Sequence, residues 1–170
     1  DLGDAYFIAS IAKIITASIV MQLVDEQQLD LSDRVIELLP GIDLTGLHRH
    51  EGTDHTEDLE VHHLLHQTSG LADYFAGGME EDFKRNRDRS YTIADIVDIA
   101  RTSGANFPPG DRDSTRSAYS DTNYQLLTAI IEGVTSQSYG DAVHQRIAEP
   151  LGLAGTYVVG DGPQPKADPL

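Results

Sequence analysis

The chain has 170 residues, 39% of them hydrophobic, which is enough for one globular domain with a core and too few for two. It has no cysteine, which excludes disulfides, thiolate catalysis and cysteine-ligated metal sites. The formal charge of −16 and the scattered positions of the 12 basic residues argue against nucleic acid as a partner.

No apolar run approaches the roughly 18 residues that a membrane-spanning helix needs. The first residues also lack the basic start and apolar run of a signal peptide. We therefore expect a soluble chain whose compartment the sequence leaves open. The excess of acidic residues fits either an ordinary acidic protein or a salt-adapted surface.

Apolar residues at helical spacing predict a helix from Ile11 to Val24, beginning at or just before Ser10 and buried on most of its circumference. A short second helix is expected after Ser32, a good N-cap residue, and ends at Pro40. Between residues 41 and 60 the periodicity disappears, so this polar stretch is predicted to be an exposed loop.

The middle of the chain is expected to hold two more helices. A brief helix over residues 61–65 leads into a turn at residues 68–70. Thr92 and Asp95 resemble a capping box that opens a longer helix, which Gly104 should end.

The last third is also expected to be mainly helical. Prolines, glycine and polar residues predict a loop over 107–121, and an apolar stripe over 126–134 predicts a strong helix. A last helix is expected near 141–148, before Pro150. Strand signals are sparse, and residues 156–159 are the best candidate.

One motif suggests catalysis. Ser10 and Lys13 are three residues apart, so on a helix they share one face and the lysine amine can reach the serine oxygen. The first turn of a helix also places Ser10 in a positive field that favours an alkoxide-like transition state. Taken alone, this spacing is more typical of a helix-start serine with a solvated lysine.

The wider sequence resembles the β-lactamase/penicillin-binding-protein-like family over five segments in the family's order. The first is FIASIAKIITASIVMQLVDEQQLDLSDRVIELLP, and the others are VHHLLHQTSGL, FPPG, YSDTNYQLLTAIIEGVT and EPLGLAGT. Together they cover most of residues 6–156. The resemblance implies an α+β, β-lactamase/transpeptidase-like fold and a serine hydrolase that works through an acyl-enzyme.

The resemblance also assigns a second motif. In class C β-lactamases, D-alanyl-D-alanine peptidases and related esterases this motif is tyrosine, any residue, asparagine, and here it is Tyr119-Ser120-Asp121. It implies that Tyr119 points at Ser10 and Lys13 and acts as the base. Asp121 departs from the family by replacing an amide with a carboxylate that only accepts hydrogen bonds. We expect it to bond to Lys13, a change that can weaken recognition of a β-lactam amide.

The family's third motif, a lysine or histidine followed by threonine or serine and glycine on a strand, has no counterpart in these residues. Only nine residues precede Ser10, where the family has strands. We therefore expect residues 1–170 to be a partial domain, mainly the helical lobe with the nucleophile helix and little of the central sheet. Its uncovered apolar face predicts self-association or completion by another segment.

The implied reaction is acyl transfer to Ser10 from a β-lactam, D-alanyl peptide or ester carbonyl. Lys13 and Tyr119 move the proton, the Ser10 amide stabilises the oxyanion, and no cofactor is expected. Two alternatives stay open: a carboxylesterase with little β-lactam activity, which Asp121 favours, and a non-catalytic member that binds peptidoglycan-like or peptide ligands. Members of the family are often periplasmic or secreted.

A cluster of histidines and one further serine suggest other chemistry less well. The histidines can bind zinc at such spacings, but several lie in a polar loop without a clear carboxylate geometry, so no metal site is expected. Ser69 lacks the Gly-x-Ser-x-Gly elbow of α/β-hydrolases, and a turn role is expected instead. The histidines are His48, His50, His55, His62, His63 and His66.

Overall fold

The computed structural model describes residues 5–110 and 116–164. The helices are α1 (Ala12–Asp25), α2 (Val35–Leu38), α3 (Val61–Leu65), α4 (Glu80–Arg85), α5 (Ile93–Ser103), α6 (Asp121–Thr135) and α7 (Tyr139–Val143). The shorter elements are the 3-10 turns η1 (Ala9–Ile11) and η2 (Thr56–Asp58), the π-helical turns η3 (Phe75–Met79) and η4 (His144–Ala148), and the antiparallel strands β1 (Arg49–His50) and β2 (Thr53–Asp54). Helices dominate, as expected for a helical lobe.

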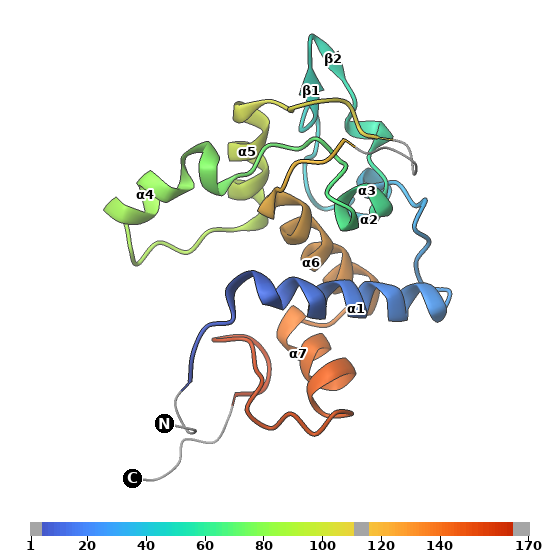
Figure 1. The fold of residues 1–170 in the computed structure, drawn as a ribbon, viewed down its shortest axis with the longest axis vertical. Helices are drawn as coiled ribbons and strands as arrows, with labels where there is room; N and C mark the ends of the chain where they lie inside the picture. The colour runs from blue at the N-terminus through green and yellow to red at the C-terminus, as the bar shows by residue number, and fades with distance from the viewer. Residues whose placement is uncertain (1–4, 111–115, 165–170) are drawn as a thin grey trace.

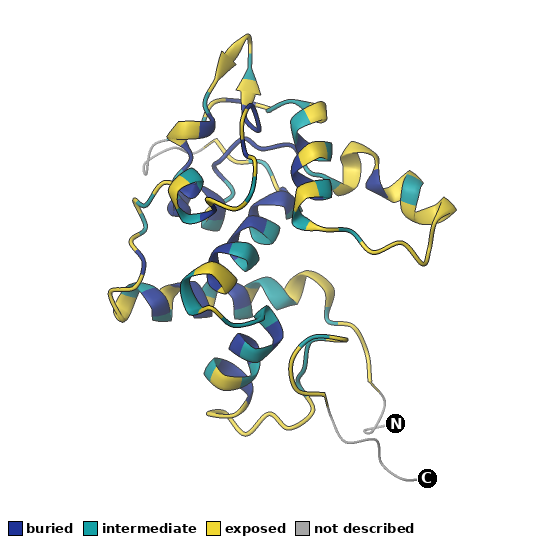
Figure 2. Ribbon diagram, turned by 180° about the vertical axis from the view of Figure 1, so that it is seen from behind, coloured by how far each residue is buried: buried dark blue, intermediate teal, exposed yellow. Residues whose placement is uncertain are grey.

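Helix α6 is the centre of the hydrophobic core. It contacts α1, α2, α3, α5 and α7. Its side chains Leu126, Leu127, Ile130 and Ile131 are fully buried, and each such burial contributes about 1.5–3 kcal/mol. In Figure 1, α1 crosses the middle of the molecule, with α7 on one side of it and α2, α3, α5 and the hairpin on the other. Figure 2 shows buried residues where these helices meet.

Helix α1 is less buried than its sequence predicts. Its last turns bury Ile19, Val20 and Leu23, whereas Ile11 and Ile14 near its start are 65% and 69% exposed. The reason is that α6, α7 and η4 pack on one side of α1, and within the described residues nothing covers the outer side of its first turns. The expected burial on most of the circumference is therefore wrong.

The stretch from residue 41 to 60 is not the exposed loop that its polarity predicts. Leu44, Leu47 and Leu59 are buried in the core, and a hairpin pairs Arg49 with Asp54. These leucines follow no helical or strand period, because each enters the core from an irregular backbone, so the pattern gives no signal of their burial.

Of the two helix starts that capping residues predicted in the first two thirds of the chain, one is confirmed and one is wrong. Thr92 and Asp95 form the predicted capping box of α5, and Gly104 ends this helix with a φ of 73°. Ser32 does not cap α2, because its hydroxyl donates to Asp30 instead and α2 begins at Val35.

Two expectations near the C-terminal end need correction. Ser138 caps α7 by accepting from the Asp141 amide, so this helix begins two residues earlier than predicted. Residues 156–159 form no strand, and only an isolated bridge joins Val158 to Asp161. A strand needs a neighbour for its hydrogen bonds, and the described residues offer none there. Of the predicted loop over 107–121, residues 111–115 lie outside the described residues.

Two buried histidines form hydrogen bonds to the backbone inside the fold. His48 is fully buried, with its Nε2 2.8 Å from the carbonyl oxygen of Ser69. His63 is also buried, and its Nδ1 accepts the amide of Glu60 at the start of α3. Burial lowers the pKa of both imidazoles. In the part of the chain that the structure describes, no three His, Asp or Glu side chains gather as a metal would require.

No helix within residues 5–110 and 116–164 has the length and apolar character needed to cross a bilayer.

The buried histidines predict acid-sensitive folding. Since their pKa values are lowered in the folded chain, the unfolded chain binds more protons below about pH 6.5. The free energy of unfolding should be nearly constant above pH 7 and should fall as the pH drops through 6.5, by up to about 1.4 kcal/mol per pH unit for each histidine. Urea unfolding between pH 5 and 8 measures this slope.

Matched variants separate the effect of a buried histidine on this slope from that of an exposed one. His48→Gln should lower stability at pH 8 but flatten the slope, whereas the exposed His66→Gln should leave it unchanged. An equally steep slope in His48→Gln would remove His48 as its source.

Candidate active site

Ser10 lies just before the N-terminal end of α1. It sits in η1, which runs directly into α1, and Lys13 follows one turn later with its Nζ 3.2 Å from the Ser10 Oγ. Ala9, immediately before the serine, has a φ of 46°. A non-glycine residue in this left-handed region costs on the order of 1–3 kcal/mol, and such strain concentrates at functional sites.

The second motif reaches the same point from the other helix. Tyr119 directly precedes α6, and its hydroxyl lies 2.8 Å from the Ser10 Oγ. Asp121 is the first residue of α6, and its Oδ1 lies 2.5 Å from the Lys13 Nζ and accepts the Tyr119 hydroxyl at 2.8 Å. The four residues singled out from the sequence therefore form one hydrogen-bonded cluster.

The charge on Lys13 is stabilised by its neighbours. Partial burial alone lowers the pKa of its amine, but the hydrogen bonds and negative charge of Asp121, with Tyr119, outweigh that effect and raise the pKa overall. The Lys13 ammonium also lies 5.1 Å from the centroid of the Tyr119 ring and 5.5 Å from that of Tyr124. At neutral pH Lys13 is therefore a cation that can attract negative charge developing on Ser10.

The cluster is open to solvent. Ser10 is exposed and Tyr119 is 56% exposed, so a substrate carbonyl has direct access to the serine hydroxyl.

Gln67 holds the segment that carries Tyr119, and sequence reasoning missed it. Its backbone carbonyl accepts the amide of Ala118 at 3.1 Å, and its side-chain Oε1 accepts the amide of Ser120 at 3.0 Å. The residues on both sides of Tyr119 are thus tied to one glutamine. Gln67 itself has a φ of 60°, and no local sequence pattern marks this position.

The two hydrogen bonds by which Gln67 holds the backbone on both sides of Tyr119 form a clamp. A buried polar network supports this clamp. The Gln67 Oε1 also accepts the Asn123 side-chain amide at 2.5 Å, and the Asn123 Oδ1 accepts the Ser69 hydroxyl at 2.6 Å. Asn123 and Ser69 are fully buried, and the Ser69 Oγ also accepts the amide of Leu71. The Ser69 hydroxyl therefore stabilises the turn.

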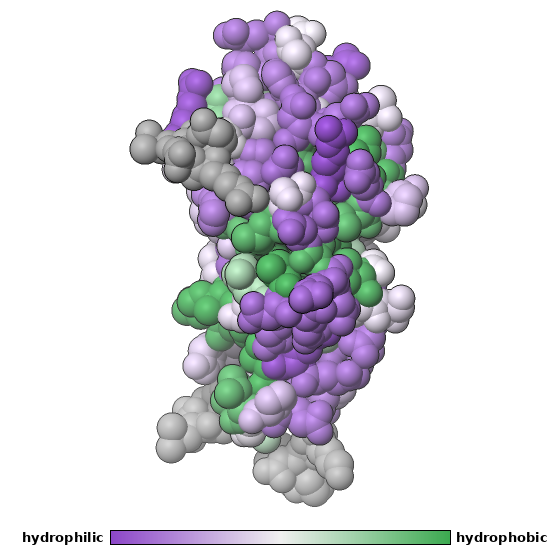
Figure 3. Space-filling view, turned by 90° about the vertical axis from the view of Figure 1, so that its right-hand side faces the viewer, coloured by the Kyte–Doolittle hydropathy of each residue, from purple (hydrophilic) through white to green (hydrophobic). Residues whose placement is uncertain are grey.

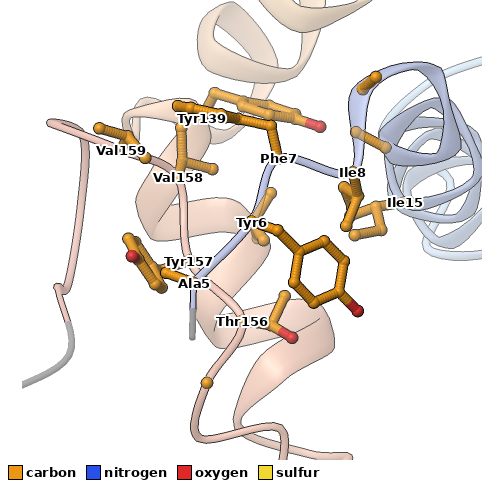
Figure 4. Close-up of a pocket in the computed structure, with 14 residues that line it drawn as sticks. Ala5, Tyr6, Phe7, Ile8, Ile15, Tyr139, Thr156, Tyr157, Val158 and Val159 are labelled. Carbon is orange, nitrogen blue, oxygen red and sulfur yellow. The ribbon is translucent and has the colours of Figure 1, made fainter. Parts of the chain in front are cut away.

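A cavity of about 610 Å³ lies beside η1, away from the cluster. It is lined mainly by apolar side chains of the N-terminal segment and of residues 155–159, with Tyr139 and Ile15 (Figure 4). Ala9 and Ala12 line it, but Ser10, Lys13, Tyr119 and Asp121 do not. We therefore place the candidate site at the hydrogen-bonded cluster and not in this cavity.

Known proteins resemble the chain over most of its length. The family model described as beta-lactamase matches residues 3–169. Penicillin-binding protein 4 of Amycolatopsis lactamdurans is 35% identical over 144 residues, which are 85% of this chain and 33% of that protein. The chain thus spans about a third of the length of this relative.

Solved structures share the fold. A D-stereospecific amidohydrolase from a Streptomyces species matches with a TM-score of 0.74 and 34% identity, over 87% of this chain and 42% of that one. The octameric penicillin-binding protein homologue from Pyrococcus abyssi matches with a TM-score of 0.65 and 34% identity, over 86% and 31%. The expected β-lactamase/transpeptidase-like fold is confirmed, and the chain belongs to the beta-lactamase family of serine hydrolases.

Proposed function

We propose that this chain carries the nucleophile of an acyl-transferring serine hydrolase, with Ser10 as the acylated residue. The observation that carries the proposal is the contact of the Ser10 Oγ with both the Tyr119 hydroxyl, at 2.8 Å, and the Lys13 Nζ, at 3.2 Å. A hydroxyl within hydrogen-bonding reach of a base and a cation is the arrangement of an activated nucleophile.

The proposed reaction has two stages. The Ser10 Oγ attacks a substrate carbonyl while Tyr119 accepts its proton and the Lys13 ammonium favours the negative charge. The Ser10 amide donates to the oxyanion, the leaving group departs with a proton, and an acyl-enzyme remains. Water then attacks the acyl group by the reverse proton path, and no cofactor takes part.

The substrate is proposed to be a small molecule or peptide with an amide, β-lactam or ester carbonyl. The Streptomyces relative is a D-stereospecific amidohydrolase and the Amycolatopsis relative a penicillin-binding protein, which supports an amide of D configuration. Asp121 supports the alternative of a carboxylesterase with little β-lactam activity, because an ionised carboxylate cannot donate a hydrogen bond to a β-lactam amide. Comparing turnover of nitrocefin, short-chain nitrophenyl esters and D-alanyl peptides by the full gene product distinguishes these.

Covalent labelling tests the nucleophile. Incubation of the full gene product with a fluorophosphonate or labelled penicillin should add the probe's mass to Ser10, and Ser10→Ala should abolish labelling at a folding cost of at most about 0.5–2 kcal/mol. Lys13→Met and Tyr119→Phe should each slow acylation by roughly 10²–10⁴. A wild-type protein that binds the probe without a covalent adduct would instead be a non-catalytic binder.

We expect the catalytic contribution of Tyr119 to depend on the hydrogen bonds of Gln67. Because Gln67 fixes the backbone on both sides of the tyrosine, Gln67→Ala should misplace the phenol and reduce kcat/KM by about 10²-fold. Gln67→Glu keeps an oxygen that accepts from Ser120 and Asn123, and it should restore most of the activity. The control is Gln145→Ala, which changes an exposed glutamine elsewhere in the chain. Equal activity of both alanine variants would show that the Gln67 clamp does not affect catalysis.

We also propose that residues 1–170 form one part of the catalytic domain and that their exposed apolar face is covered by another segment or a second copy. Tyr6 and Phe7 are 82% and 85% exposed, and Ile11 and Ile14 are 65% and 69% exposed. Figure 3, which views the right-hand side of Figure 1, shows further hydrophobic side chains across the middle of that face. Exposed apolar patches of this kind mark interaction surfaces. The Pyrococcus relative is an octamer, which supports self-association.

Residues 1–170 expressed alone should therefore associate and hydrolyse nitrocefin and nitrophenyl esters poorly, with a loss of about 10²–10³ if an oxyanion donor is missing. Sedimentation velocity over a wide concentration range measures the association. Replacing Tyr6 and Phe7 by serine should weaken it more than Leu151→Ser, which changes another exposed apolar residue, 66% exposed and close after η4. A fully active monomer would contradict both statements.

A further inference from the structure

The hydrogen bonds of the cluster fix the direction of each proton. The Tyr119 hydroxyl lies 2.8 Å from the Ser10 Oγ and 2.8 Å from the Asp121 Oδ1, and it has a single proton to donate. An ionised carboxylate only accepts, so the phenol proton goes to Asp121. The Ser10 hydroxyl is then the donor to the phenol oxygen. The three groups form a chain of two hydrogen bonds in which Ser10 donates to Tyr119 and Tyr119 donates to the carboxylate.

The Asp121 carboxylate lies directly beside the phenol oxygen of Tyr119. If Tyr119 were a phenolate before it accepted the serine proton, two anionic oxygens would lie 2.8 Å apart. Both would share the single ammonium of Lys13, whose Nζ lies 2.5 Å from the same Oδ1. Two like charges at this separation repel each other. A base that passes its own proton onward avoids that cost.

We propose that Asp121 is the terminal proton acceptor of a two-proton relay from Ser10 through Tyr119, an inference that rests on the proposed function. As the Ser10 Oγ bonds to the carbonyl carbon, its O–H bond breaks and that proton moves to the Tyr119 oxygen. The phenol's own proton moves to the Asp121 Oδ1, and the carbonyl electron pair moves onto the substrate oxygen. Tyr119 stays a neutral phenol and Lys13 stays an ammonium.

The relay then runs backward. When the tetrahedral intermediate collapses, the leaving nitrogen or oxygen takes a proton from Tyr119, and Tyr119 regains one from Asp121. The carboxylate is restored before water attacks the acyl-enzyme, and the same path can serve deacylation. Every proton that leaves Ser10 is accounted for, and no further reactant is needed.

Asp121→Asn tests the relay with little change in shape. The asparagine Oδ1 can still accept from Tyr119 and Lys13, but it cannot take up a proton. Acylation of Ser10 by a nitrophenyl ester in the full gene product should slow by about 10²–10⁴, while far-UV circular dichroism stays unchanged. Asp73→Asn is the matched control, because the Asp73 carboxylate accepts the nearby Phe75 amide and should not affect the rate. A residue that only holds Lys13 and Tyr119 in place would tolerate the asparagine.

The solvent isotope effect on acylation offers a second readout, which starts from the wild-type protein. Acylation rates in mixtures of H₂O and D₂O should follow a bowed curve, because two protons move in one step, and Asp121→Asn should give a straight line. An adduct on Ser10 together with a straight wild-type line, or an Asp121→Asn rate equal to or above wild type, would overturn the relay alone. A wild-type protein without any Ser10 adduct would overturn the proposed function and the relay together.

Discussion

The packing of α6 against α1 is the contact on which the rest of this structure depends. Helix α6 is the buried centre of the core, and its first residue, Asp121, forms an ion pair with Lys13, the second residue of α1. Two motifs more than one hundred residues apart are thereby held within hydrogen-bonding distance. Rigid helices hold catalytic geometry more tightly than loops do, so the same apolar packing that stabilises the lobe also positions the reactive groups.

The polar interactions around this contact select one arrangement of the site, whereas the apolar core stabilises the fold as a whole. Gln67, Asn123 and Ser69 are tied together by hydrogen bonds beneath Tyr119. Fully bonded buried networks of this kind favour one arrangement over its alternatives, because any slip leaves a buried donor or acceptor unpaired. The left-handed backbone at Gln67 and at Ala9 shows that both sides of the site are held in less common conformations. Strain of this kind persists only where the surroundings over-determine it.

The site combines access with charge. Ser10 and Tyr119 face solvent, whereas the Lys13 and Asp121 side chains are 20% and 28% exposed and form an ion pair. In a family whose second motif ends in asparagine, a carboxylate at this position changes which groups can donate and accept. Ser10 therefore lies beside a net neutral ion pair and not beside an isolated cation, and the proposed proton path and substrate preference both start from that difference.

The sequence by itself determined the helix-rich lobe and the proximity of Ser10 and Lys13, because helical periodicity and spacing are local signals that need no coordinates. The family followed from five motifs in order, and the resemblance to that family, not any local pattern, implied that Tyr119 meets Ser10. The capping box at Thr92 was also predictable, since it involves neighbours in the chain. Only the tertiary structure decided the burial of Leu44, Leu47 and Leu59, the exposure of Ile11 and the clamp at Gln67. Each of these depends on contacts between segments distant in sequence, and such contacts leave no periodic pattern along the chain.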